Sequence, residues 1–290
     1  MSQPEFLTTA ELAALLRIKE RKVYDLAATG AVPCTKAMGK LLFPRKAIDH
    51  WLEQSGAGLR LVGRQERKSV VVGSHDPLLD WALRESRCSL ATFLDGSFDG
   101  LDRFGAGEAV ATGLHVHEGG NAWNVATVSG RFSQERVVLV EFAWRERGLV
   151  VAPNSAITSL ADLRGRRVMA RQAEAGSQKL FIALLQEQGI GIGDMNLSAP
   201  ARNETDAALG VLEGKADAAF GLAALARQHR LAFIPVIRER FDLLVDRRAY
   251  FEPALQKLWT FCRSRQFAEK AAEQAGYDVS GLGRVHFNGA

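Results

Sequence analysis

The chain of 290 residues is 47% hydrophobic and 24% charged, which excludes a disordered chain and leaves room for more than one core. No apolar run is long enough to span a bilayer and no signal peptide is recognisable, so we expect a cytoplasmic protein without membrane contact. The cysteines Cys34, Cys88 and Cys262 lie far apart, which argues against a zinc or dithiol site.

Basic residues gather near the start of the chain. Residues 1–68 hold 12 Lys and Arg against 7 Asp and Glu, whereas the remainder holds 25 against 26. Positive charge raises the affinity for polyanions whatever the fold, so this end of the chain favours nucleic acid as a partner. An ordinary solvated surface is the alternative that the charge count leaves open.

The first patterned segment is FLTTAELAALLRIKERKVYDLAATG, which predicts two short helices separated by a bend. Thr8 or Thr9 can cap the first helix, Ile18 marks the bend, and Gly30 ends the second helix. Apolar residues recur along one face of each helix, so both helices can pack on one core. This is the spacing of a helix-turn-helix motif.

Residues 38–43 can form a small wing, and residues 45–52 a third helix. In a helix-turn-helix motif the start of the second helix contacts base edges in the major groove. We therefore expect Lys19, Arg21, Lys22 and Tyr24 to contact double-stranded DNA. Two further residues, Lys40 and Arg45, are expected to contact its phosphates. A short amphipathic hairpin for protein contacts is the alternative.

Three segments follow one another in the order of a known family: LTTAELAALL, KERKVYDLAATGAVP and GKLLFPRKAIDHWL. Together they resemble the excisionase-type, MerR-related winged helix-turn-helix domain. The family usually has basic and aromatic residues in the wing, whereas this chain has Lys40, Leu41, Leu42 and Phe43. The resemblance implies a DNA-binding domain over residues 1–55.

Residues 56–68 contain glycines and basic residues without a helical stripe, which predicts a linker. From residue 69 onward short apolar runs alternate with amphipathic stretches. This alternation is typical of parallel strands joined by helices, so residues 69–290 are expected to form an α/β ligand-sensing domain of two lobes.

Hydroxyl groups stand where predicted strands end and helices begin. Ligands of open α/β sheets bind beyond the carboxyl ends of the strands, and the first N–H groups of a helix favour an anion. One such turn precedes a helix expected from about Ser177, with Arg171 at the end of the preceding strand as a fixed positive charge. The candidate ligand-binding residues are Ser74, His75, Ser97, Arg171, Gly176, Ser177 and Thr205. Each serine alone could be only a helix cap.

Two later stretches are long and apolar. VVLVEFAWRERGLVVAP predicts two strands or one long strand with a turn, and LAFIPVIRERFDLLVDR predicts a strand pair. The tail is expected to form two helices joined near Ser264. GLHVHEGGNAWNVATV is expected to form a loop over the cleft.

Other chemistries are weighed and disfavoured. His115 and His117 could lie on one side of a strand, but no third metal ligand is identifiable nearby, so no metal site is expected. Adjacent Ser74, His75 and Asp76 cannot form the hydrogen-bonded chain of a catalytic triad. No nucleotide motif is present, and we expect neither catalysis nor a cofactor.

A second resemblance covers residues 69–283. Its segments are SHDPLLDWAL, GSFDGLDRFGAGEAVATGLH, RGLVVAP, SLADLRGRRVMARQAEAGSQKL, EGKADAAFGLAALA and FIPVIRERFDLLV. In this order they resemble the type II periplasmic-binding-protein-like domain related to molybdate- and tungstate-binding proteins, which bacterial regulators carry behind a helix-turn-helix. The resemblance implies an oxyanion held between two lobes, by Ser74 and Ser97 on one side and by Gly176, Ser177 and Thr205 on the other.

This chain departs from that pattern at two places. Phe220, Gly221 and Leu222 stand where molybdate-binding proteins often have a tyrosine, and Ala175-Gly176-Ser177-Gln178 replaces a Gly-Ser-Gly-Thr-like turn. Arg171 and His75 add positive or proton-donating groups to a site of hydroxyls and amides. A carboxylate or another small anion therefore stays open as the ligand.

Taken together, the sequence favours a one-component, ligand-responsive DNA-binding regulator. Because helix-turn-helix proteins commonly bind two half-sites, we expect a homodimer or a higher homo-oligomer. The competing hypothesis is a cytoplasmic anion-binding protein whose N-terminal helices contact a protein partner. An enzyme ranks third.

Overall fold

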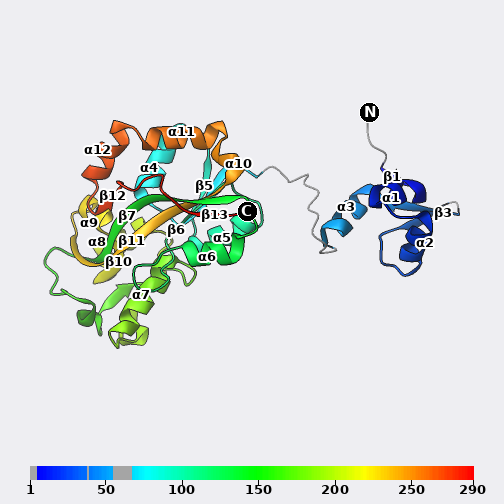
Figure 1. Ribbon diagram of the computed structural model, residues 1–290. Helices are drawn as coiled ribbons and strands as arrows, with labels where there is room; N and C mark the ends of the chain where they lie inside the picture. The colour runs from blue at the N-terminus through cyan, green and yellow to red at the C-terminus, as the bar shows by residue number, and fades with distance from the viewer. Residues whose placement is uncertain (1–4, 38, 55–66) are drawn as a thin grey trace. The chain divides into compact units, whose positions relative to one another are not determined.

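The computed structural model describes residues 5–37, 39–54 and 67–290 (Figure 1). The chain divides into two units, Met1–Gln65 and Glu66–Ala290. Met38 of the expected wing and most of the expected linker lie outside the described residues.

The first unit contains a three-stranded sheet in the order β1-β3-β2 and three helices. Its elements are β1 (Phe6–Leu7), α1 (Thr9–Leu16), α2 (Glu20–Ala28), β2 (Thr35–Ala37), β3 (Lys40–Pro44) and α3 (Arg45–Gln54). Helices and strands share one small core, which includes Leu12, Val23, Phe43 and Ile48. The helix-turn-helix arrangement is confirmed.

Local capping explains how α1 begins and ends. The Thr8 hydroxyl accepts a hydrogen bond from the Glu11 N–H, and the Glu11 carboxylate accepts one from the Thr8 N–H, which satisfies two free donors at the helix start. The helix ends at Leu16, and the left-handed backbone of the next residue, Arg17, turns the chain toward α2. The expected cap at Thr8 is confirmed.

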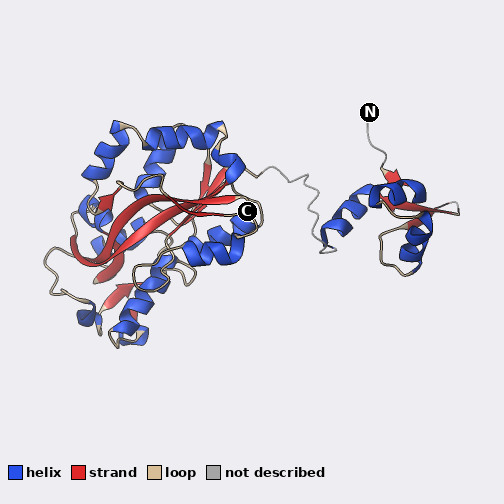
Figure 2. Cartoon of the chain, viewed as in Figure 1, coloured by secondary structure: helices blue, strands red, loops and turns tan. Residues whose placement is uncertain are grey.

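The second unit is built on a ten-stranded sheet. Its strands are β4 (Val70–Gly73), β5 (Ala91–Phe93), β6 (Ala111–Leu114), β7 (Val137–Val151), β8 (Arg167–Met169), β9 (Asn196–Leu197), β10 (Ala218–Leu222), β11 (Ala232–Asp246), β12 (Tyr277–Asp278) and β13 (Val285–Asn288). The order is β5-β4-β6-β11-β7-β10-β8-β9, with β12 and β13 also paired to β7. The antiparallel strands β7 and β11 run through the whole unit, as Figure 2 shows.

These two long strands divide the unit into two lobes. The helices of the unit are α4 (Pro77–Glu85), α5 (Ser97–Gly105), α6 (Val125–Phe132), α7 (Gly176–Glu187), α8 (Glu204–Leu212), α9 (Ala223–Gln228), α10 (Arg247–Tyr250), α11 (Pro253–Cys262) and α12 (Arg265–Glu273). In the first lobe α4, α11 and α12 pack on one face of the sheet, and α5 and α6 pack on the other. In the second lobe α7 covers one face, and α8 and α9 cover the opposite one. The two-lobed α/β fold is confirmed.

The expectation of a turn within each long apolar stretch was wrong. β7 and β11 are each a single strand of 15 residues. Arg145 and Arg147, which suggested a turn, lie two positions apart and are both buried, because an acidic side chain of β11 pairs with them. Charged residues can thus continue a buried strand when ionic partners are supplied from the neighbouring strand.

The expected loop is shorter than predicted, because residues 113–114 belong to β6 and α6 begins at Val125, and its position over the cleft stays a prediction. Trp123 and Asn124 are almost completely buried. The Asn124 side chain accepts a hydrogen bond from the Val116 N–H at 2.5 Å and donates one to Asp242 at 2.7 Å. These bonds hold the end of this segment against β11.

Among residues 5–37, 39–54 and 67–290, no helix combines the length and the apolar character needed to cross a bilayer.

Candidate functional site

Two serines of the first lobe meet beyond the ends of their strands. Ser74 follows β4 and Ser97 begins α5, and their hydroxyl oxygens lie 2.7 Å apart. Gly100 lets α5 lie close to β4, because a Cβ there would lie 2.3 Å from the Gly73 Cα. The Ser97 hydroxyl also accepts a hydrogen bond from the His115 N–H at 3.2 Å.

The second lobe meets this serine pair with the start of α7. A Cβ built on Gly176, the first residue of α7, would lie 3.0 Å from Ser97 Oγ and 3.3 Å from His115 Cε1. Ser177 is next in the helix and is buried, and no described residue hydrogen-bonds with its hydroxyl. The expected helix therefore begins one residue earlier, and its free N–H groups stand at the boundary between the lobes.

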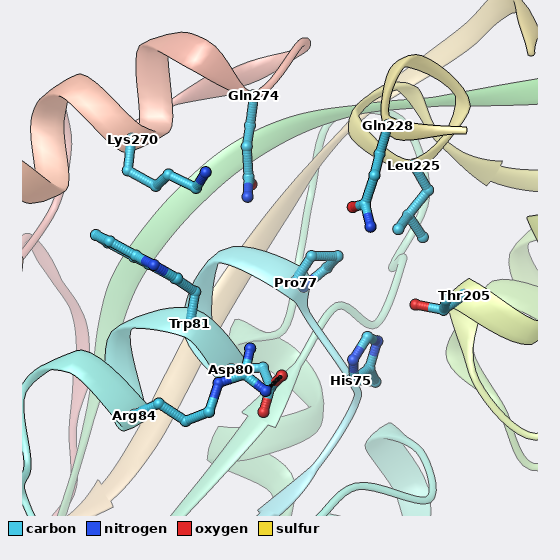
Figure 3. Close-up of a pocket in the computed structure, with 10 residues that line it drawn as sticks. All are labelled: His75, Pro77, Asp80, Trp81, Arg84, Thr205, Leu225, Gln228, Lys270 and Gln274. Atoms are coloured by element: carbon cyan, nitrogen blue, oxygen red, sulfur yellow. Dashed lines mark ion pairs between the residues drawn. The ribbon is translucent and has the colours of Figure 1, made fainter. Parts of the chain in front are cut away.

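His75 and Thr205 lie together at a second place, a pocket of about 350 Å³ (Figure 3). His75 comes from the turn before α4 in the first lobe, and Thr205 comes from the first turn of α8 in the second. The pocket is lined by His75, Pro77, Asp80, Trp81, Arg84, Thr205, Leu225, Gln228, Lys270 and Gln274. Six of the seven predicted ligand residues therefore fall into two groups, one at the Ser97 contact and one at this pocket, and Arg171 belongs to neither.

Arg171 is held by backbone contacts rather than by the serines. Its Nη1 donates to the Ala201 carbonyl at 2.9 Å, and its N–H donates to the Gln178 side chain at 2.8 Å. Its Nε is buried, without a hydrogen-bond partner among the described residues. Burial lowers the pKa of Arg171, while Glu204 opposes this effect. Arg171 joins β8 to the segment before α8, and a direct role in ligand binding stays a prediction.

A buried group of charged residues lies between the lobes, and the sequence analysis missed it. Its centre is Glu239 of β11. Glu239 Oε1 lies 2.7 Å from Arg145 Nε and 2.9 Å from Arg147 Nε. Both contacts are ion pairs, and neither has the geometry of a hydrogen bond. Glu239 Oε2 lies 2.9 Å from His115 Nδ1.

The same two arginines extend the contacts into both lobes. Arg145 Nη1 donates a hydrogen bond of 2.7 Å to Asp76 Oδ2. The same oxygen also accepts a hydrogen bond from the Tyr277 hydroxyl. Arg147 forms two hydrogen bonds of 3.1 Å with Glu204, at the start of α8. We call Asp76, His115, Arg145, Arg147, Glu204 and Glu239 the interlobe charge cluster.

The charges within the interlobe charge cluster determine its protonation states. Burial alone would raise the pKa of Glu239, but Arg145 and Arg147 outweigh burial and hold it well below its usual range. Burial likewise opposes ionisation of Glu204, yet Arg147 and Arg171 lower its pKa to about 2. Burial lowers the pKa of His115, against the charge of Glu239. Glu204 and Glu239 are thus ionised, and the His115 imidazole is neutral.

The sequence contains a pattern that could have predicted the pairing of Glu239 with Arg145 and Arg147. Arg145 and Arg147 alternate within an apolar run, and Glu239 stands in a similar run. A charge inside a buried strand requires an ionic partner, so opposite charges in two such strands predict a pair. The register that pairs them, and the contacts with Asp76 and Glu204, depend on how the sheet is assembled.

Several buried donors near the lobe boundary lack partners. No described residue accepts a hydrogen bond from Ser177 Oγ, Arg145 Nη2 or Arg171 Nε, and His75 Nδ1 is likewise unpartnered. A buried polar group left without a partner costs about 1–3 kcal/mol, so several of them suggest that a ligand completes the hydrogen bonds. Neutral hydroxyls and helix-start N–H groups suit an anion.

The predicted DNA contacts lie at the start of α2, on β3 and at the start of α3. Lys19 precedes α2, Arg21 and Lys22 lie in its first turn, and Tyr24 is 52% exposed. Lys40 opens β3 and is also exposed. Arg45 is partly buried, with its Nε 3.4 Å from the Asp49 carboxylate, and its contact with phosphate stays a prediction.

The two histidines weighed as metal ligands contact different groups. His115 bonds to Glu239, whereas His117 Nε2 lies 2.9 Å from the Gly120 carbonyl and its ring lies against Trp123. Within the part of the chain that the structure describes, no three His, Cys, Asp or Glu residues are placed to hold a metal ion.

Comparison with known proteins places these features in context. A family model described as "PBP superfamily domain" matches residues 81–263, and one described as "Helix-turn-helix domain" matches residues 6–56. The protein YvgK of Bacillus subtilis (strain 168), described as uncharacterized, is 21% identical over 306 residues, covering 98% of this chain and 99% of YvgK.

One of two similar solved structures supports the fold of the second unit. A substrate-binding protein with bound phosphate from Clostridium perfringens matches with a TM-score of 0.54 at 11% identity, covering 73% of this chain and 99% of that one. The periplasmic aliphatic sulphonate binding protein SsuA from Escherichia coli is 16% identical, with a TM-score of 0.43, over 69% of this chain and 75% of SsuA. At 11% identity, the match to the Clostridium perfringens protein shows that the fold is similar and shows nothing about function.

Proposed function

The chain belongs to the PBP superfamily domain family, and from this premise we propose that it is a transcriptional regulator that binds DNA in response to a small anion. The single observation that carries the proposal is the set of buried donors where the lobes meet. Ser97 of the first lobe, which is hydrogen-bonded to Ser74, lies against the start of α7, where the Ser177 hydroxyl has no partner among the described residues.

The proposed ligand is a small oxyanion, with molybdate and tungstate as the specific candidates that the sequence resemblance implies. Ser74, Ser97, Gly176 and Ser177 would supply hydroxyl and N–H donors. His75 and Thr205, which line the separate pocket, and Arg171 stay predicted ligand residues outside this group. The Clostridium perfringens protein of similar fold has bound phosphate, which supports the same class of ligand. A small carboxylate is the alternative.

Binding without catalysis fits the contacts of the Ser74-His75-Asp76 turn. The Ser74 hydroxyl is bonded to Ser97, and the Asp76 carboxylate is engaged by Arg145 and Tyr277. We propose a cytoplasmic homodimer or higher homo-oligomer, because a helix-turn-helix regulator commonly binds two half-sites. We also propose the domain division 1–55, 56–68 and 69–290.

A route for the signal follows two elements that leave the site. Helix α5 begins at Ser97 and carries Phe104 in its last turn. The Phe104 ring lies 4.2 Å from the Arg67 guanidinium, and the Phe104 carbonyl accepts an Arg67 hydrogen bond. Strand β11 carries Glu239 and ends at Asp246, 3.1 Å from Arg67 Nε. Arg67 therefore joins both elements at the point where the chain enters the second unit.

Lobe closure around an anion would move α5 and β11, and Arg67 would pass that movement to the DNA-binding domain. An effector changes an equilibrium only through different contacts in the two states. We expect Arg67→Ala to keep its affinity for the anion and to lose the anion-dependent change in DNA affinity. Arg265→Ala, on the exposed surface of α12, is the control.

The ligand proposal is tested by calorimetry with molybdate, tungstate, phosphate, sulfate and small carboxylates. Ser97→Ala and Ser177→Ala should each weaken binding by about tenfold or more, because each removes a donor to a buried charge. Ser129→Ala, in α6, removes a hydroxyl that bonds only within its own helix and should leave affinity unchanged. If no anion binds to the wild type, the sensor proposal is wrong.

The alternative function is an anion-binding protein whose N-terminal helices contact a protein. The exposure of Leu15 and Tyr24 on the first unit favours this alternative. Binding to a mixed-sequence DNA duplex at several salt concentrations separates the two, since DNA affinity must fall steeply with salt. A protein that shows no affinity for duplex DNA at low salt would support the alternative.

A further inference from the structure

His115 stands inside the proposed anion site, although sequence reasoning considered it only for metal binding. It directly follows β6, and its side chain is 2% exposed. Its backbone N–H donates to Ser97 Oγ, and its Nε2 lies 3.4 Å from the position that a Cβ on Gly176 would take. The ring edge that carries Nε2 therefore faces the start of α7, next to the Ser97 hydroxyl.

The other ring nitrogen fixes where the proton lies. Nδ1 is 2.9 Å from Glu239 Oε2, and the other oxygen of that carboxylate lies between the guanidinium groups of Arg145 and Arg147. A carboxylate beside two arginines is ionised and can only accept a hydrogen bond. The hydrogen bond therefore requires the proton on Nδ1, as in histidines oriented by a carboxylate.

The charge of the ring follows from its surroundings. Burial lowers the pKa of His115, the Glu239 charge opposes that effect, and Arg145 and Arg147 lower the pKa further. From α5 the neighbouring group is the neutral Ser97 hydroxyl, and from β11 it is also the Phe241 ring. A neutral ring with its proton on Nδ1 has a lone pair on Nε2. Among the described residues, none hydrogen-bonds with Nε2.

We propose that His115 gives the site a hydrogen-bond acceptor, which selects an oxyanion that carries a proton over one that is fully ionised. The inference rests on the proposed function, and within its class of small oxyanions it places phosphate and arsenate ahead of molybdate and tungstate, the candidates that the sequence resemblance implies. An oxygen of sulfate, molybdate or tungstate would face the Nε2 lone pair with a lone pair of its own. Phosphate and arsenate keep a proton at neutral pH, and that O–H can donate to Nε2.

Selection of this kind can be large, because a buried polar group leaves an incorrect ligand with an unpaired contact. The remaining donors, which are the Ser97 and Ser177 hydroxyls and the first N–H groups of α7, serve the other oxygens of either class of anion. Glu239 is a positioning residue in this scheme, since it acts through the ring and does not touch the anion.

Calorimetry on the full chain near neutral pH, with five anions, tests the proposal. Phosphate and arsenate should bind at least about tenfold more tightly than sulfate, molybdate and tungstate. Anion size does not explain such a division, because arsenate is larger than phosphate and sulfate is close to phosphate in size. Equal affinities, or tighter binding of the fully ionised anions, would overturn the proposal. The wild-type measurements decide this without any variant.

Two variants then assign the preference to His115. In His115→Gln the amide can present either a donor or an acceptor, so the ratio of phosphate to sulfate affinity should fall to within about threefold. His117→Gln is the matched control, because His117 contacts the Gly120 carbonyl outside the site, and it should keep the wild-type ratio. A preference that survives in His115→Gln, with a wild-type thermal unfolding profile, would refute the assignment.

The outcomes separate this inference from the proposed function. If no anion of either class binds, the sensor proposal and the inference both fail. If anions bind without preference for those that carry a proton, the sensor proposal stands and only the role of His115 is rejected.

Discussion

The two units of this chain use charge in opposite ways. In the first unit Lys19, Arg21 and Lys22 are exposed around the start of α2, and they are available to a large polyanion. In the second unit Arg145 and Arg147 are buried and neutralised by carboxylates from both lobes. Substitution of an exposed charge should change binding with little effect on stability. Substitution of a buried charge should lower stability, because its ionic partners come from both lobes.

The largest expected effect comes from disrupting the buried ion pairs of the second unit. Glu239→Gln leaves two buried guanidinium groups without their shared counter-charge, so the free energy of unfolding should fall by about 3–5 kcal/mol. Denaturant unfolding of the full chain measures this change. Glu269→Gln removes an exposed partner of Arg265 and should change stability by less than about 1 kcal/mol. Equal effects of the two variants would show that the interlobe charge cluster does not stabilise the fold.

The pH dependence of stability should reveal Glu204, whose pKa is lowered from 4.5 to about 2 in the folded protein. The unfolded chain binds this proton more readily, so the stabilisation is present above pH 4.5 and is lost as the pH falls toward 2. The shift corresponds to about 3 kcal/mol. Glu204→Gln should flatten the loss of stability between these pH values. An unchanged acid-unfolding curve in the variant would contradict the prediction.

A smaller effect is expected where the lobes touch through a glycine. Gly176→Ala introduces a Cβ 3.0 Å from Ser97 Oγ, so the lobes could no longer approach as closely. Anion affinity should fall by about tenfold, or 1.4 kcal/mol, while the helix itself is preserved. Calorimetry measures this change, with Gly193→Ala as the control because nothing lies within 4 Å of that position. If both variants bind alike, closure at Gly176 is not part of binding.

The smallest effect on stability is expected at the exposed charges. Arg21→Ala and Lys22→Ala should change unfolding by less than about 0.5 kcal/mol, because neither makes a buried contact. Each should weaken binding to all DNA sequences if it contacts a phosphate, and should lower the salt slope by about one unit. Fluorescence anisotropy at several salt concentrations provides the measurement. Unchanged affinity and slope in both variants would show that α2 does not face the DNA.

Much of the architecture was predictable from local pattern. Thr8, Glu11 and the apolar positions of α1 and α2 specify a helix-turn-helix within a short stretch, since caps and helical stripes depend on near neighbours. The alternation of apolar runs and amphipathic stretches likewise indicated the α/β second unit. Predictions failed at β7 and β11, where an interruption by charged residues suggested turns in strands that are continuous.

By itself the sequence determined which segments become helices and strands and which hydroxyls stand at helix starts, because these features follow from residues close together in the chain. Only the tertiary structure decided that Glu239 pairs with Arg145, Arg147 and His115, and that Gly176 lies against Ser97. These contacts join residues up to 124 positions apart, so strand order and register must be set before they exist. Local periodicity carries no information about which distant strand becomes a neighbour.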